Sequence, residues 1–180
     1  MKTFLAVSTA ALGLALTGCA PATEVTSTPD DAGGDPSKRA NQTAKVGSQI
    51  TLTGMEKELK IAVKVARVIR NAKGKDEFNR PEKGSRFVAV QIVLKNVGTQ
   101  AYDDSPTNGA KLIDADDQQY DADFSEIAAG PFIGSAVKIA PGNSRKGFIV
   151  FLVPKTAKLA KFQFTLDSGF AGQSGEWALN

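Results

Sequence analysis

Residues 87–94 read Phe-Val-Ala-Val-Gln-Ile-Val-Leu, a run whose two alternating faces are both largely apolar. Successive side chains of an extended chain point to opposite sides, so every second residue shares a face. The residues of the more apolar face are Val88, Val90, Ile92 and Leu94. A strand that is apolar on both sides is typical of the middle of a sheet. The run therefore predicts a central β-strand.

Other segments show the same two-residue period. Residues 147–153 form a second strand that is apolar on both faces, after a turn at 141–144. Alternation between two faces is also seen in residues 161–166 and 59–65. Arg67 interrupts the apolar row that begins at Leu59, so the strand at 59–65 is expected to bend or end there. Phe162, Phe164 and Leu166 are expected to point inward.

Residues 111–120 indicate a hairpin with an acidic turn, and no segment carries a sustained helical stripe with caps. Short strands separated by turns predict an all-β protein, an antiparallel immunoglobulin-like β-sandwich. Residues 46–180 would form this domain, stabilised by packing alone because the chain has a single cysteine.

The N-terminus has the layout of a secretory signal peptide: Lys2, an apolar stretch from Phe4 to Leu16, then small residues. Leu16-Thr17-Gly18-Cys19 resembles the lipobox of bacterial lipoproteins. The resemblance implies that residues 1–18 are cut off and that the Cys19 thiol carries a diacylglyceryl group. A transmembrane anchor is the poorer alternative, since about 20 apolar residues are needed to span a bilayer. Ordinary secretion, with Cys19 left as a free thiol, is the other alternative.

Residues 19–45 are rich in Thr, Ser, Pro, Asp, Gly and Ala, and Val25 is their only large aliphatic residue. Such a segment buries too little apolar area to offset its ordering entropy, so a lipidated, disordered tether is expected. Its mean reach would be about 25–30 Å. The protein is therefore expected on the extracellular face of the cell membrane, with the membrane as partner through Cys19.

The order of motifs is similar to that of a known family. The motifs are residues 46–50, 94–98, 112–120, 139–144 and 147–154. Together they resemble the telokin-like, immunoglobulin-fold domain of unknown function found on Gram-positive surface lipoproteins, a sandwich shared by secreted mycobacterial immunogenic antigens. The resemblance covers about residues 46–166 and implies the fold, but brings no catalytic residues. The family often has glycine in the hairpin turn, where this chain has Asp117-Gln118.

Composition excludes several kinds of chemistry. The chain has no histidine, which removes the usual general base and the commonest metal ligand. Its only cysteine is assigned to lipid, and no phosphate-binding glycine loop is present. We therefore expect no enzyme, no catalytic residues, no cofactor and no bound metal. An exported protein is not expected to bind nucleic acid, and its oligomeric state is not predicted.

The acidic hairpin is the one cluster with a sharper interpretation. Its carboxylates are Asp114, Asp116, Asp117, Asp121 and Asp123, with Asp103 and Asp104 expected nearby. Carboxylates suit Ca²⁺, and extracellular sites can be weak. The spacing lacks the glycine and the glutamate of an EF-hand loop. A solvated turn is the simpler interpretation, and weak binding of Ca²⁺ or a small solute stays as the alternative function.

Charge is unevenly distributed. Residues 55–95 hold eleven Lys or Arg against five Asp or Glu, and residues 131–166 hold six against none, a net charge of +6 in each. Residues 100–130 carry a net charge of −7, from one Lys against eight acids. The basic segments could form one face that meets anionic lipid or wall polymers, or ordinary solvated sheet faces.

Two aromatic residues outside the central strands have two interpretations. Trp177 and Tyr102 either line a ligand surface or, for Trp177 with Leu179, pin a terminal strand to the sandwich. The phenylalanines are expected mostly in the core. The leading functional hypothesis is a membrane-anchored binding module of the cell envelope that meets an envelope protein or wall polymer. An enzyme acting on wall or lipid precursors is a weaker third hypothesis.

Overall fold

The computed structural model describes residues 24–26 and 43–179. The strands are β1 (Glu24–Thr26), β2 (Ala44–Lys45), β3 (Gln49–Thr53), β4 (Lys60–Ala72), β5 (Ser85–Asn96), β6 (Tyr102–Asp104), β7 (Ala110–Asp114), β8 (Gln119–Asp123), β9 (Val137–Ile139), β10 (Ser144–Pro154), β11 (Leu159–Thr165) and β12 (Ser174–Ala178). The described residues contain one 3-10 turn, η1 (Asp167–Gly169), and no α-helix. The predicted all-β class is confirmed.

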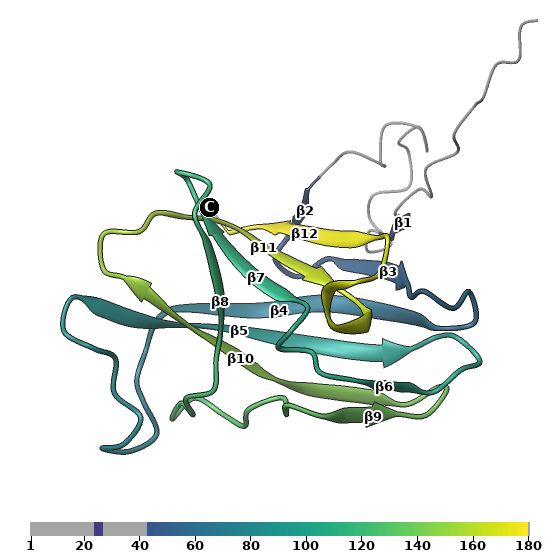
Figure 1. The fold of residues 1–180 in the computed structure, drawn as a ribbon, viewed down its shortest axis with the longest axis horizontal. Coiled ribbons are helices and arrows are strands. Elements are labelled where there is room, and N and C mark those ends of the chain that lie inside the picture. The colour runs from purple at the N-terminus through teal and green to yellow at the C-terminus, as the bar shows by residue number, and fades with distance from the viewer. Residues whose placement is uncertain (1–23, 27–42, 180) are drawn as a thin grey trace, which may run out of the picture.

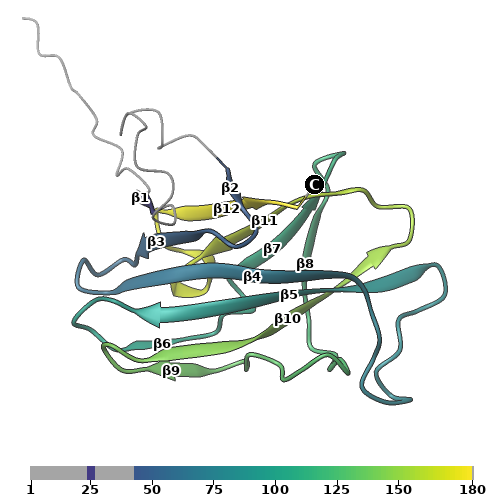
Figure 2. The same cartoon turned by 180° about the vertical axis from the view of Figure 1, so that it is seen from behind.

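The strands form two packed layers, seen from opposite sides in Figures 1 and 2. One layer has the order β1-β3-β4-β5-β10, and the other has the order β7-β11-β12-β2. Strand β8 joins the layers, because its first half pairs with β7 and its last residues pair with β10. Strands β6 and β9 form a separate two-stranded ladder. All pairings are antiparallel except that of β12 with β2. The predicted sandwich is therefore confirmed.

Strand β5 lies between β4 and β10, as its two apolar faces predict. Its inward residues and those of β4 and β10 pack with Phe162 and Phe164 of β11 in the main core. The register of β4 against β5 shifts between Val65 and Arg67, which marks a β-bulge. The strand therefore bends near Arg67, as expected, but continues to Ala72 instead of ending.

A second, smaller core lies on the outer face of the same sheet. Phe87, Ala89, Phe148 and Val150 are buried there with Ile127, which comes from the connection between β8 and β9. The Arg67 guanidinium lies 5.2 Å from the centre of the Phe148 ring. This connection covers one half of the outer face and leaves the other half to solvent.

Trp177 closes the edge of the sandwich opposite β8. Its side chain is fully buried, and its Nε1–H donates to the Ser48 carbonyl oxygen at 3.1 Å, which links β12 to the start of β3. Its ring centre lies 5.9 Å from that of Phe162. Leu179 is also buried. The prediction that Trp177 and Leu179 pin a terminal strand is confirmed.

The predicted tether differs from the structure at two places. Residues 24–26 form β1 on the edge of β3, and residues 44–45 form β2 on the edge of β12. Backbone pairing to an open strand edge supplies hydrogen bonds that composition alone does not reveal. The predicted signal peptide, Cys19 and the rest of the predicted tether lie outside the described residues.

Candidate functional site

Two connections meet at one end of the sandwich. The first joins β4 to β5 (residues 73–84), and the second is the start of the β8–β9 connection (residues 124–128); we call this pair the loop platform. The Lys75 N–H donates to the Glu126 carbonyl at 3.0 Å, and the Ala128 N–H donates to the Lys73 carbonyl at 3.0 Å. In Figure 1 the β4–β5 connection lies at the left-hand end of the sandwich, where β4 ends and β5 begins.

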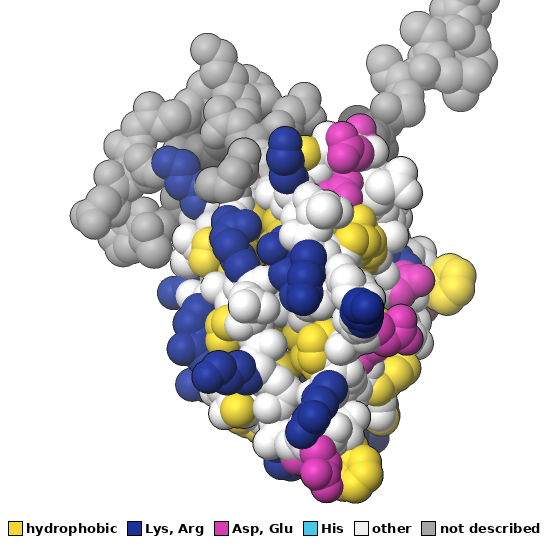
Figure 3. All heavy atoms as spheres, turned by 90° about the vertical axis from the view of Figure 1, so that its left-hand side faces the viewer, with side chains coloured by type: hydrophobic (Ala, Val, Ile, Leu, Met, Phe, Trp, Pro, Cys, Tyr) yellow, Lys and Arg dark blue, Asp and Glu magenta, His cyan; other side chains and the backbone are white. Residues whose placement is uncertain are grey.

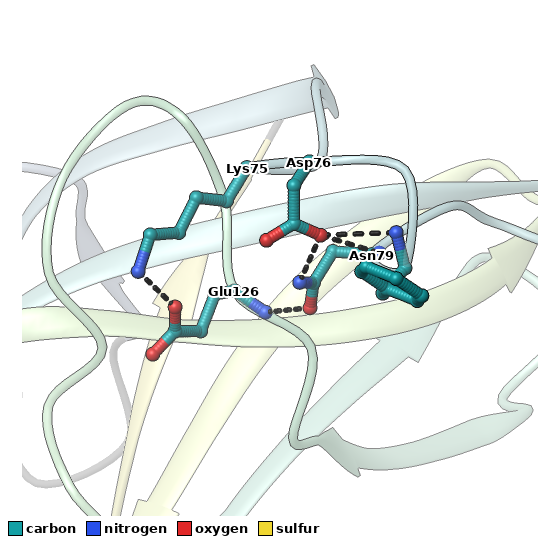
Figure 4. Close-up of polar contacts among 5 residues, drawn as sticks. Lys75, Asp76, Asn79 and Glu126 are labelled. Carbon is teal, nitrogen blue, oxygen red and sulfur yellow. Dashed lines mark hydrogen bonds and ion pairs between the residues drawn. The ribbon is translucent and has the colours of Figure 1, made fainter.

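Side chains reinforce this backbone pairing (Figure 4). One oxygen of Asp76 accepts hydrogen bonds from the Phe78 N–H at 3.0 Å, the Asn79 N–H at 3.1 Å and the Asn79 Nδ2 at 2.8 Å. The bond from the Asn79 side chain is the main reason that the pKa of Asp76 is lowered. Asn79 Oδ1 in turn accepts from the Glu126 N–H at 2.6 Å, and Lys75 and Glu126 form an ion pair. The platform is thus held from both connections.

Gly74 permits the close approach inside the platform. A Cβ atom at this position would lie 1.5 Å from the Asn79 carbonyl oxygen, well inside van der Waals contact. Glycine is needed at this position because the backbone of the β4–β5 connection approaches itself closely here.

The platform carries exposed aromatic rings. Phe78 is 89% exposed and Phe124 is 65% exposed, and the Phe124 ring meets Phe132 edge-on with centroids 6.4 Å apart. The expectation that phenylalanines lie in the core is wrong for these two and for Phe170 in the 3-10 turn region, which is 81% exposed. Phe78 stands in a polar stretch without an apolar neighbour two residues away, a signal that could have shown its exposure.

The surroundings of the platform are basic. Figure 3 looks onto this end of the molecule and shows Lys and Arg side chains spread across it, with acidic side chains toward one side and the lower rim. Of the residues described, no His, Cys, Asp and Glu side chains gather in a group of three or more that could hold a metal ion. Rings and charges displayed on a fixed loop pair suit contact with another molecule.

The acidic hairpin is not gathered into one site. Asp114 is buried, and its carboxylate accepts from the Asp116 N–H and Gln118 N–H at 3.0 Å each and from the Tyr120 hydroxyl at 2.8 Å. Asp117 adopts a φ of 58°, a left-handed conformation that aspartate tolerates. Asp114 therefore organises the β7–β8 turn.

Four other acids of the predicted cluster have separate partners. Asp121 pairs with Lys111, Asp103 pairs with Lys138 at 2.9 Å, and Asp123 accepts from the Ser125 N–H at 2.7 Å. Asp104 accepts from the Ser168 N–H at 2.9 Å. The carboxylates expected near one another thus face different groups, and the geometry gives the Ca²⁺ hypothesis no support.

Asp114 makes the stability of the hairpin depend on pH. The hydrogen bond from Tyr120 is the main cause of its lowered pKa. A lowered folded-state pKa stabilises the fold above the ordinary aspartate pKa of about 4, and this contribution is lost as the pH falls through the folded-state value. Asp114→Asn is therefore expected to melt lower than the wild type at pH 7, with the gap narrowing at pH 3. A gap independent of pH would contradict this role.

Tyr102 and Trp177 do not line a surface. Both side chains are fully buried, so the expectation that they meet a ligand is wrong. Tyr102 begins the short ladder with β9 and packs into the main core, and burial raises the pKa of its hydroxyl. No helix within residues 24–26 and 43–179 is long and apolar enough to span a membrane.

The sequence profile of a domain of unknown function, DUF4352, matches residues 53–175, which include every strand from the start of β4 to β11. The chain belongs to this family. No curated protein sequence matches the chain.

Solved structures share the DUF4352 fold at low identity. The "putative lipoprotein" ycdA of Bacillus subtilis has a TM-score of 0.55 at 15% identity over 76% of this chain, which spans only 39% of ycdA. The secreted protein MPT63 of Mycobacterium tuberculosis has a TM-score of 0.55 at 18% identity, over 76% of this chain and 96% of MPT63. The yjhA protein of Bacillus subtilis has a TM-score of 0.52 at 12% identity, over 77% of this chain and all of yjhA. These likenesses establish the fold alone.

Proposed function

We propose that this protein is a lipoprotein anchored through Cys19 to the extracellular face of the cell membrane, and that its sandwich is a non-enzymatic interaction module for another envelope protein. The lipobox-like sequence before Cys19 supports the anchor. The descriptions of two structural neighbours, a "putative lipoprotein" and a secreted protein, support the compartment. We also propose that the domain is a telokin-like, immunoglobulin-fold domain of the kind found on Gram-positive surface lipoproteins, which it resembles in the order of its motifs.

The loop platform carries the proposal. Its two connections are held together by backbone and side-chain hydrogen bonds, and they display Phe78 at 89% exposure. A group that is already ordered pays less conformational entropy on binding than a flexible one. Buried aromatic anchors also dominate the binding energy of many protein interfaces. Phe78, with Phe124 on the other connection of the platform, fits the role of such an anchor.

Phe78→Ser is expected to reduce capture of a partner from solubilised membranes about 30-fold, the effect of losing one aromatic anchor worth about 2 kcal/mol. Its melting temperature should stay at the wild-type value because the ring is exposed. When cells are fractionated, the wild type should be found with the membranes and the Cys19→Ser variant outside them.

Phe170→Ser is the matched control, since Phe170 is 81% exposed but lies next to the 3-10 turn, outside the loop platform. This variant should capture the partner like the wild type. Equal capture by all three proteins, or no partner at all, would contradict the proposal.

A further inference from the structure

The half of the outer sheet face that the β8–β9 connection leaves uncovered is strongly basic. Strands β4, β5 and β10 lie side by side there (Figure 2). Five exposed cationic side chains occupy its outward positions, and we call this set the basic sheet face. They are Lys60, Lys64, Arg67, Lys95 and Lys146.

The pairing register places these charges on one face. Lys64, Val93 and Lys146 are directly opposite one another across the three strands, and Ala62, Lys95 and Ser144 form the adjacent row. Neighbouring strands lie about 4.8 Å apart, and residues two apart on one strand about 6.7 Å. The five cations therefore cover roughly 20 Å by 10 Å. The two basic segments seen in the sequence form a single surface because β5 pairs with both β4 and β10.

No ion pair within residues 43–179 neutralises this surface. The four ion pairs among those residues use Lys75, Lys111, Lys138 and Lys161, none of them on the basic sheet face. The described residues opposite the five cations carry no acid. Lys95 lies diagonally next to Lys64 and Lys146, at about 7–8 Å, so these like charges repel one another. An anion supplied from outside would offset that repulsion.

The arrangement of the charges on the basic sheet face indicates the kind of anion. Between the cations lie small or uncharged residues, and Ala62 is only 2% exposed. Cations spread over such a face can each meet a different group of an anionic surface, and each Lys or Arg near that surface adds to the attraction.

We propose that the basic sheet face docks the domain onto the anionic headgroups of the membrane leaflet. This inference rests on the proposed location of the protein. Cys19 stands only five positions before β1 in the sequence, so its anchor would hold the domain near that leaflet. A weak contact then suffices, because tethering raises its effective concentration. Docking through the sheet face leaves the loop platform, at the end of the strands, available for a protein partner.

Flotation of the full chain with vesicles tests the docking. The chain carries Cys19→Ser, so that lipidation plays no part. Phosphatidylcholine vesicles measure any binding by the N-terminal apolar segment, and vesicles that also contain phosphatidylglycerol measure the electrostatic contribution. We expect binding that requires phosphatidylglycerol and weakens with salt. The triple variant Lys64→Gln, Lys95→Gln, Lys146→Gln should bind about 100-fold more weakly.

The control variant Lys83→Gln, Lys155→Gln, Lys158→Gln removes the same charge from exposed positions outside the basic sheet face. It should lose no more than a few-fold, and thermal melting should show that both triple variants fold. Equal losses in the two variants would overturn the proposal, as would binding to soluble polyphosphate without binding to vesicles. Because this assay uses unlipidated protein and no protein partner, its failure would leave the Phe78 capture result unaffected.

Discussion

Replacing Asn96 with alanine is expected to lower the free energy of unfolding by about 3 kcal/mol. The side chain is fully buried at the end of β5. Its Nδ2 donates to the carbonyls of Gln100 at 2.7 Å and Ile139 at 2.9 Å, and its Oδ1 accepts from the Gly98 N–H at 3.0 Å. Alanine leaves the Gln100 and Ile139 carbonyl oxygens without this donor, at about 1–2 kcal/mol each, whereas the Gly98 N–H keeps the Lys60 carbonyl as an acceptor at 3.1 Å. Urea denaturation followed by tryptophan fluorescence measures the loss.

Asn96→Asp is the matched variant, because it keeps the shape of the side chain and removes its donor. At neutral pH its carboxylate would face two carbonyl oxygens, so it should be less stable than the alanine variant. This additional loss of stability should shrink as the pH falls. It should disappear below the ordinary aspartate pKa of about 4, where the carboxyl group is protonated in both the folded and the unfolded chain. A loss below about 1 kcal/mol in the alanine variant would show that water replaces the amide.

Trp177→Ala is expected to have an equal or larger effect, about 3–5 kcal/mol, typical of removing a buried large aromatic side chain. The ring packs on Phe162 and against Gly175, where an added Cβ would lie 2.8 Å from the indole. The indole N–H also provides the hydrogen bond to Ser48 that joins the two layers. Thermal and urea unfolding followed by circular dichroism measure the change, since the variant lacks the fluorophore.

Trp177→Phe separates packing from the hydrogen bond. It retains most of the ring contacts and loses the bond to Ser48, so its loss should be smaller, about 1–2 kcal/mol. If both variants unfold like the wild type, the junction of β12 with β3 does not stabilise the sandwich.

Local patterns predicted most strands of this fold. The two-faced runs at 87–94 and 147–153 became neighbouring central strands, and the alternation of Phe162 with Phe164 correctly placed both in the core. Alternation records which side of a strand is buried, and burial is a local property of each strand. Pairing between distant strands is not local, so the double role of β8 could not be read from its five residues.

Contacts between distant segments, including those of the candidate site, were less predictable for the same reason. Asn96 stands where the sequence turns polar, and only the approach of Ile139 makes it a buried residue. The loop platform depends on Glu126 meeting Lys75 and Asn79 across a gap of about fifty residues in the chain. The basic segments were visible in the sequence, but their union into one surface required the pairing of β5 with both neighbours.

Strands β1 and β2 have a consequence for the behaviour of the protein in solution. They cover the outer edges of β3 and β12, the two positions at which the ten-stranded sheet would otherwise end. Unpaired strand edges are templates for intermolecular pairing. A fragment starting at residue 46 would retain the main core except Ala44 but expose both edges to other copies. Strands β1 and β2 therefore protect the two sheet edges from aggregation through intermolecular strand pairing.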